Sequence, residues 1–219
     1  IDEFQQISDF EDSKTFQKKL RSVWQLQQHV SYCLFGSKKH LMNELFEKKN
    51  LPFYKFGDAI YLAKIETKYW IEYICKRFEN TGKHISPELA EEICRLVDNH
   101  SSYVQQLSWL LWIRTINTAT TEQLSYALED LLDQNNILFQ SETENLSAYQ
   151  MNFLKAIVDG IHTKFSSKEV ISKYNLGTSA NIVRLKNALL QKELIETNGK
   201  EIVLADPVFG VWFKKEMLY

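Results

Sequence analysis

An acidic pair follows a single apolar residue in the opening stretch "IDEFQQI", where Asp2 and Glu3 come after Ile1. In enzymes that transfer phosphoryl groups, the two carboxylates of such a pair at the end of a buried strand have different roles. The Asp holds Mg²⁺, and the Glu orients the attacking water. The alternative is a frayed end of the chain with no chemistry of its own. The question is whether the sequence supplies the rest of such a site.

A phosphate site of this kind needs a glycine-rich loop, G-x-x-x-x-G-K, whose backbone amides wrap the phosphates. Gly82-Lys83 would need a glycine at position 77, where the chain has Arg77. Gly199-Lys200 would need one at position 194, which is Leu194. This loop supplies most of the positioning and charge stabilisation. We therefore expect no cofactor for this chain alone, neither tight ATP binding nor hydrolysis.

Composition indicates a helical globular protein. Hydrophobic residues make up 44% and charged residues 25%, with only 7 Gly and 3 Pro, so we expect short loops and many helices. No apolar run approaches the roughly 18 residues that span a bilayer, and there is no recognisable signal peptide. We expect a cytoplasmic protein without membrane contact. The widely spaced Cys33, Cys75 and Cys94 predict reduced thiols rather than disulfides or zinc ligands.

The charge balance changes near Leu146. The formal net charge is -2, yet residues 147–219 carry 10 Lys and Arg against 7 Asp and Glu. The split predicts a domain boundary, although the excess is too small to establish a nucleic-acid surface.

Residues 1–65 are expected to contain part of an α/β core. A helix predicted over 15–29 has one apolar face, formed by Phe16, Leu20, Val23 and Trp24. Val30–Phe35 is predicted as a compact buried strand ended by Gly36-Ser37, and Ala59–Ala63 as a further strand. Together with the acidic strand end, these elements predict a βαβ unit.

Residues 66–145 show helical periodicity only. Ser86-Pro87 is a favourable helix start, because Ser caps a helix and Pro suits its first position. Thr120 with Gln123 forms a capping box. "SSYVQQLSWLLWIRT" is apolar around most of its circumference, which predicts the central and most buried helix. The large aromatic residues of this region are expected in the core: Trp70, Tyr103, Trp109 and Trp112.

Residues 146–219 predict a winged helix-turn-helix. A helix stopped by Gly160, a second with a capping box of Ser166 and Glu169, and a third are followed by two strands joined at Asn198-Gly199. The third helix has inward positions at Ile182, Leu185, Leu189 and Leu190. Three helices followed by a β-hairpin are the order of this motif.

The third helix of such a motif can enter the major groove of DNA. The candidate DNA-binding residues are Thr178, Ser179, Asn181, Arg184 and Lys186, with Lys200 at the tip of the wing. The mild basicity favours a protein contact over DNA, and both stay open.

Several stretches, taken in order, carry a resemblance to a known family: "IDEFQQI", "YCLFGSKKHLM", "LPFY", "DNHSSYVQQL", "NILFQSETENLSAYQMNFLKAI" and "YNLGTSANIVRLKNALLQKELI" with a later "DPVF". From Ile1 to about Lys215 the chain resembles the Bacteroidetes-type branch of archaeal-ATPase-like P-loop proteins, relatives of AAA+ and STAND ATPases. Each stretch alone is a weak signal, and the ordered set is specific.

The resemblance implies a nucleotide-binding α/β core over 1–65, a helical lid over 66–145 and a winged helix over 146–219, with ATP and Mg²⁺ as the cofactors of the intact family. Asp2 and Glu3 resemble the second nucleotide motif (Walker B), in which Asp2 would bind Mg²⁺.

Ser37 resembles the polar sensor of the γ-phosphate, and a cap of the preceding strand explains it equally well. The lid stretch His100–Gln105 resembles a segment that usually has Pro where this chain has Ser101, which leaves a sensing role open. The basic run Lys38, Lys39 and His40 is either solvated or a phosphate contact. The candidates for an arginine finger are Arg21, Arg77, Arg95 and Arg114.

The predicted fold is mostly α with minor β: a truncated P-loop α/β core remnant, a helical lid bundle and a C-terminal winged helix-turn-helix. We expect the C-terminal portion of an AAA+-like ATPase that couples nucleotide state to the winged helix. In such sheets the first strand is central, so Val30–Phe35 and Ala59–Ala63 would have unpaired edges. The expected partner is a missing N-terminal P-loop segment or an oligomer partner. A winged-helix DNA-binding regulator and a protein-interaction module are the alternatives.

Overall fold

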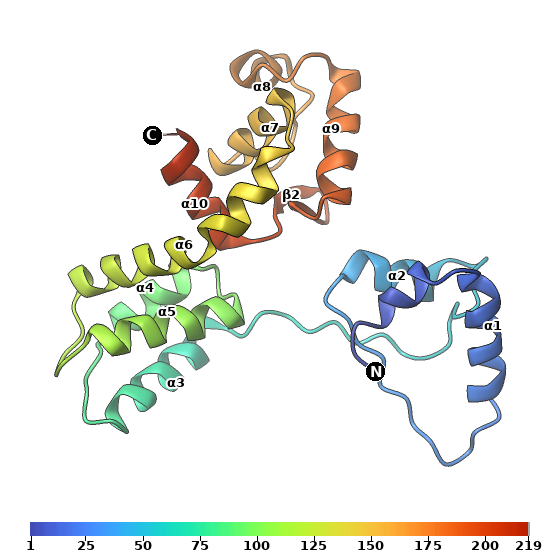
Figure 1. The fold of residues 1–219 in the computed structure, drawn as a ribbon, viewed down its shortest axis with the longest axis horizontal. Coiled ribbons are helices and arrows are strands. Elements are labelled where there is room, and N and C mark those ends of the chain that lie inside the picture. Colours follow the sequence, from blue (N-terminus) through green and yellow to red (C-terminus); the bar gives the residue numbers. More distant parts are fainter. Residues whose placement is uncertain (219) are drawn as a thin grey trace. The chain divides into compact units, whose positions relative to one another are not determined.

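The computed structural model describes residues 1–218, and the chain divides into two compact units, with the division in the sequence between Leu62 and Ala63. Each unit has its own hydrophobic core. The described residues are mostly helical, and their one sheet has two strands (Figure 1). The mostly α fold with minor β that the sequence predicts is confirmed. None of the helices in residues 1–218 has the length and apolar character that crossing a bilayer requires.

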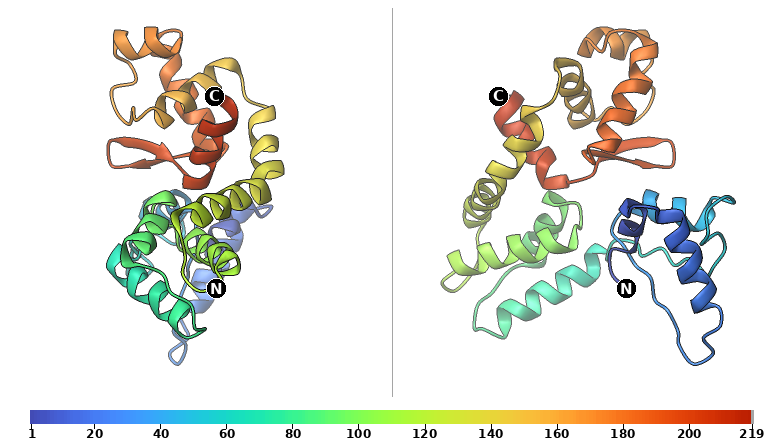
Figure 2. Two further views of the ribbon diagram at one scale, coloured as in Figure 1. Left: turned by 90° about the vertical axis from the view of Figure 1, so that its left-hand side faces the viewer. Right: turned by 45° about the vertical axis from the view of Figure 1, so that its right-hand side comes forward.

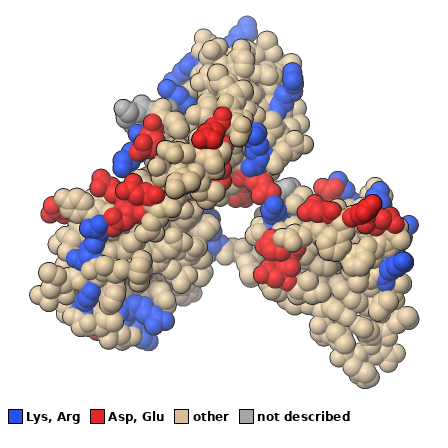
Figure 3. All heavy atoms as spheres, viewed as in Figure 1, with Lys and Arg blue, Asp and Glu red and all other residues tan. Residues whose placement is uncertain are grey.

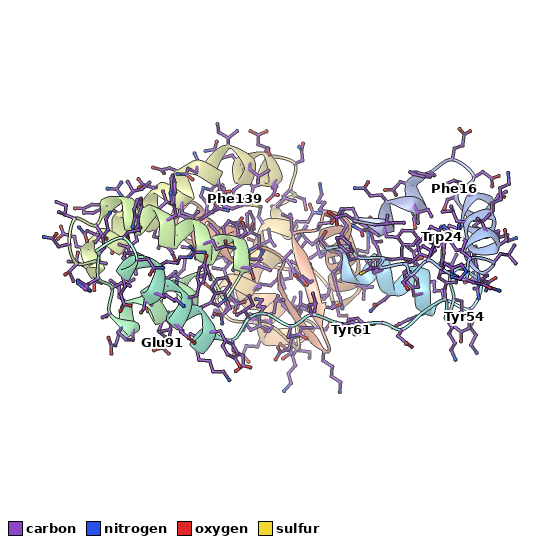
Figure 4. The ribbon with its side chains drawn as sticks, turned by 90° about the horizontal axis from the view of Figure 1, so that it is seen from below. Phe16, Trp24, Tyr54, Tyr61, Glu91 and Phe139 are labelled. Atoms are coloured by element: carbon purple, nitrogen blue, oxygen red, sulfur yellow. The ribbon has the colours of Figure 1, made fainter. Side chains whose placement is uncertain are left out.

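The first unit contains a short 3-10 helix, η1 (Phe4–Asp9), and two α-helices, α1 (Ser13–Trp24) and α2 (Lys39–Glu47). Its core is made of Phe4, Ile7, Leu45 and Phe53. Trp24 packs against this core and lies among the side chains of the unit in Figure 4.

The helix predicted over 15–29 is shorter than expected, since α1 ends at Trp24. Its expected apolar face is only partly correct. Leu20 and Trp24 pack on the core, whereas Phe16 and Val23 are exposed.

The strands predicted in the first unit do not form. Val30–Phe35 and Ala59–Ala63 are irregular chain, and neither belongs to a sheet within residues 1–218. The βαβ unit is therefore a wrong prediction for the described chain. The reason is physical: a strand needs neighbours for its backbone N–H and C=O groups. Val30–Phe35 meets one neighbour at Ile1, and for Ala59–Ala63 no strand partner lies in the described residues.

The second unit begins with α3 (Thr67–Glu79), α4 (Pro87–Leu96), α5 (Ser101–Arg114) and α6 (Thr121–Glu144). Two predicted helix starts are confirmed. Ser86 Oγ accepts from Leu89 N (3.2 Å), and Thr120 with Gln123 forms a reciprocal capping box.

Helix α5 is less buried than its composition suggests. One face is in the core, but Trp109 and Ile113 are 56% and 51% exposed. Of the aromatic residues expected in the core, Trp70 and Tyr103 are buried and Trp112 is half-buried, so the expectation is wrong for Trp109.

The chain then forms α7 (Ala148–Val158), α8 (Lys168–Tyr174), α9 (Ser179–Gln191), β1 (Ile195–Asn198), β2 (Glu201–Leu204) and α10 (Pro207–Leu218). The strands are antiparallel and the hairpin turns at Gly199, which has φ +61° (Figure 2). Three helices and a hairpin confirm the predicted winged helix.

The capping box expected at Ser166 and Glu169 is wrong, because α8 begins one residue later. Ser167 is its N-cap and accepts from Val170 N (3.3 Å). The capping box in this region lies at Ser147 and Gln150, at the start of α7.

Helix α10 packs on α6. The ring of Phe139 on α6 lies 5.5 Å from that of Phe209 and 5.6 Å from that of Trp212. The indole nitrogen of Trp212 also donates to Asn136 Oδ1 (2.8 Å). Because α6 runs unbroken from Thr121 to Glu144, the same helix packs against α5 and against α10.

Candidate functional site

The acidic pair lies beside the segment that leads to Ser37. Ile1 N donates to Cys33 O (2.7 Å), and Phe35 N donates to Ile1 O (3.0 Å). This is the bonding of a parallel pair, in which one residue bonds to the two neighbours of the residue opposite, here Leu34. Phe4 N in turn donates to Phe35 O (3.1 Å). The backbone thus holds the two stretches side by side.

This pairing brings Glu3 and Ser37 together. The Ser37 hydroxyl donates to Glu3 Oε2 (3.2 Å), and Ser37 N donates to Glu3 Oε1 (3.3 Å). Gln5 Nε2 also donates to Glu3 Oε2 (2.5 Å). Hydrogen bonds to the charged form favour it, so the Ser37 hydroxyl, followed by Gln5 and the positive charge of Lys38, lowers the pKa of Glu3. Glu3 is held as a carboxylate.

The backbone of Glu3 is unusual. Its φ of 48° and ψ of 41° place it in the left-handed region, which costs a residue with a side chain about 1–3 kcal/mol. The side chain of Asp2 contacts the backbone of the same residue, since its Oδ1 accepts from Glu3 N (2.8 Å). Strain of this kind persists only where surrounding contacts fix it, and here the contacts to Cys33, Phe35 and Ser37 do so.

Asp2 is an exposed carboxylate beside Glu3, and a Mg²⁺ ion held there would take most of its other ligands from water and phosphate. Among the side chains that the structure describes, no group of three or more His, Cys, Asp or Glu could hold a metal ion. ATP would need donors for its phosphates as well. The side chains of Lys39 and His40, in the basic run, lie outside the described part of the structure.

A groove of about 600 Å³ adjoins this site in the first unit. Its walls include residues of both segments that were predicted as strands, and Gly36 and Ser37 also line it. Several apolar side chains of these walls are open to solvent, among them Ile60 at 84% and Leu62 at 92% exposed.

Three of the four arginine-finger candidates are bound within the chain. Arg21 donates to Tyr54 O (3.1 Å), Arg95 pairs with Glu92, and Arg114 pairs with Asp130. Arg77 lies over the ring of Tyr73, 5.1 Å from its centroid. Of the four candidates, Arg77 is thus the one whose guanidinium group makes no hydrogen bond or ion pair to a described residue.

The stretch His100–Gln105 opens α5 and contacts the winged helix. The His100 ring is 4.7 Å from that of Tyr103, whose hydroxyl donates to Asp206 Oδ2 (2.5 Å). Asp206 Oδ1 accepts from Val208 N (2.7 Å) and Phe209 N (3.0 Å), so it also caps α10. Burial, and then the bond to Asp206, raise the pKa of Tyr103.

The role of Asp206 was not expected from the sequence. An Asp followed by Pro207 is a helix-start signal that would have placed α10.

The winged-helix candidates do not share one surface role. Thr178, Ser179 and Arg184 are exposed on α9 or at its start, and Lys200 is exposed at the hairpin tip. Lys186 is half-buried. Asn181 Nδ2 donates to Leu176 O (3.0 Å), so this side chain stabilises the turn before α9. Figure 3 shows Lys and Arg side chains spaced along the edge that α9 forms, with uncharged atoms between them.

The chain ends in a winged helix, and its fold is similar to that of a Walker-type ATPase. Residues 137–215 match the family described as "Probable winged helix domain", whose match begins inside α6. Over 97% of its length the chain matches the structure of a Walker-type ATPase of Pyrococcus abyssi, with a TM-score of 0.72 and 18% identity.

The chain spans 61% of the length of that ATPase. At this identity the likeness shows the fold alone. No curated protein matches the sequence. The division into 1–65, 66–145 and 146–219 stays a prediction.

Proposed function

We propose that this chain carries the acidic pair, the sensor, the lid and the winged helix of a P-loop ATPase, and that it hydrolyses ATP when another segment supplies the phosphate-binding loop. The observation that carries the proposal is the contact of the Glu3 carboxylate with Ser37, set by the pairing of Ile1 with Cys33 and Phe35. In this role Asp2 would hold Mg²⁺, Glu3 would orient the attacking water and Ser37 would contact the γ-phosphate.

The groove gives the phosphate-loop segment a place to bind. Two segments with strand-forming sequences line it, and apolar side chains of both are exposed. A β-strand laid between them would pair with their backbone groups and cover Ile60 and Leu62. The fold likeness agrees, because the Pyrococcus ATPase contains elements beyond those that this chain matches.

Hydrolysis is tested in the purified chain and in a fusion to a segment that carries a G-x-x-x-x-G-K phosphate-binding loop. The chain alone should show no turnover above background, and the fusion should turn over Mg-ATP. Glu3→Gln should abolish turnover, while Glu11→Gln, at an exposed glutamate of the same unit, should not. Turnover by the chain alone, no turnover by the fusion, or turnover that survives Glu3→Gln would each contradict the proposal.

The groove is tested by a matched pair of substitutions in a two-piece version of the fusion. Ile60→Asp places a charge on the groove wall, whereas Leu26→Asp places one at a position that is 81% exposed and outside the groove. Binding of the loop-bearing piece should be lost in the first variant and kept in the second. Equal binding by both variants would show that the strand does not lie in the groove.

The winged helix would act on a macromolecular partner, and α9 favours a protein over DNA. Its outward face combines Arg184 with Val183, which is 60% exposed, and Asn181 is committed to the fold. A salt-dependent shift of duplex DNA that is abolished by Arg184→Ala with Lys186→Ala would instead establish the DNA-binding regulator. No shift at low salt would support the protein partner.

A further inference from the structure

Gln5 is a buried polar side chain next to the candidate site. It is only 2% exposed, yet its amide nitrogen reaches Glu3 Oε2 at 2.5 Å, the oxygen that also accepts from the Ser37 hydroxyl. Its amide oxygen is buried and has no hydrogen-bond partner in the described structure. A buried amide half-satisfied in this way is costly.

Gly36 lies directly against the Gln5 side-chain amide. A Cβ at position 36 would overlap Gln5 Oε1, and it would lie 2.9 Å from Gln5 Cδ and 3.2 Å from Met42 Sδ. Gly36 is not among the glycines with positive φ, so its backbone alone does not demand glycine. The demand comes from the close approach of Gln5.

We propose that Gln5 is a positioning residue that holds the Glu3 carboxylate against Ser37, and that Gly36 leaves the space that the Gln5 amide occupies. The amide and the Ser37 hydroxyl meet on Oε2, while among the described side chains and backbone groups Oε1 of Glu3 accepts only the longer bond from Ser37 N (3.3 Å). One carboxylate oxygen is thereby anchored, and the other is left to accept a further donor such as water. The hydrogen bond from Gln5 to Glu3 and the packing at Gly36 do not depend on the proposed function, whereas the catalytic role of Gln5 rests on it.

The hydrogen bond is tested by NMR of the side-chain amide of Gln5 in the 219-residue chain. An amide proton that donates to a carboxylate resonates downfield, so Glu3→Gln should move the Gln5 signal upfield. Gly36→Ala should move it in the same direction, because the added Cβ displaces the amide.

The first unit supplies two matched controls. Gly57→Ala adds a Cβ with nothing within 4 Å and should leave the Gln5 signal in place. Gln17 is also 2% exposed, and its amide donates to Ser13 Oγ (2.9 Å), so its signal should stay fixed in every variant. A Gln5 signal unmoved by Glu3→Gln, or moved as far by Gly57→Ala as by Gly36→Ala, would overturn the proposal.

If Gly36→Ala unfolds the unit, Gly36→Ala in the Gln5→Ala background should fold, since the clashing amide is gone. Failure of that double variant to fold would refute the packing argument.

In the ATPase fusion, Gln5→Met keeps the volume and removes the amide. We expect it to lower kcat about tenfold or more with KM unchanged, while Gln17→Met changes neither, because misplacing a catalytic group lowers turnover. An unchanged kcat would overturn the positioning role. A fusion without any turnover, together with the expected NMR shifts, would refute the proposed function and leave the hydrogen bond established.

Discussion

Asp206 joins two parts of the second unit through a single carboxylate, and its removal should be costly in two separable ways. Asp206→Ala deletes the cap of α10, worth about 1 kcal/mol. It also leaves the hydroxyl of Tyr103, a residue that is 9% exposed, without its partner, which costs about 1–2 kcal/mol. We therefore expect the free energy of unfolding to fall by about 2–3 kcal/mol, and Tm by roughly 4–12 °C for a domain of this size.

The assay is urea unfolding followed by tryptophan fluorescence, which reports mainly on the second unit because four of the five Trp residues lie there. Tyr103→Phe should cost only about 1 kcal/mol, since the cap survives. In the Tyr103→Phe background, Asp206→Ala should cost about 1 kcal/mol, the cap alone. Asp206→Asn is the intermediate case: its one carboxamide oxygen can keep the cap by accepting from Val208 N and Phe209 N, while an NH2 group replaces the oxygen that accepts from the Tyr103 hydroxyl. A cost of Asp206→Ala that is the same in both backgrounds would refute the reasoning.

Three further predictions concern the same unit. Burial and then the charge of Asp206 raise the pKa of Glu142, so the folded state binds its proton more tightly than the unfolded chain does. The associated stability is present below the unfolded pKa and is lost as pH rises through the folded pKa. Glu142→Gln should thus raise the urea midpoint at pH 7 and not near pH 3. Phe139→Ala, at a ring that is 1% exposed, should cost about 3–5 kcal/mol by the same assay. Gly199→Ala, at φ +61°, should destabilise the hairpin by about 1 kcal/mol, seen as faster amide exchange across Ile195–Leu204, whereas Gly57→Ala should not.

The helical parts of the fold could be predicted from local signals. The starts at Ser86 and Thr120 and the turn at Asn198-Gly199 depend on residues close in sequence, and each is confirmed. Where two local signals compete, the predicted helix start is wrong by one residue. Either Ser166 or Ser167 could cap α8. The turn in which Ser167 N donates to Lys164 O makes Ser167 the N-cap.

Long-range features could not be read in this way. Whether Val30–Phe35 becomes a strand depends on neighbours that its own composition does not describe, and the exposure of Trp109 depends on which face of α5 meets other helices. At the candidate site, Asp2 and Glu3 were predicted from their types and Ser37 from the family resemblance, and Glu3 and Ser37 do meet. Gln5 was not found, because the sequence around this glutamine carries no signal of the glycine that it faces across a separation of 31 positions.

The unbroken course of α6 has a mechanical consequence. Its 24 residues make a rod about 36 Å long at 1.5 Å per residue. A tilt of about 10° at the first turn of such a rod displaces its last turn by about 6 Å. Because Phe139 and Asn136 clamp α10 to the far end, that displacement carries α10 with it. A small rotation of α3, α4 and α5 would thereby be amplified into a displacement of several ångströms at the opposite end of α6.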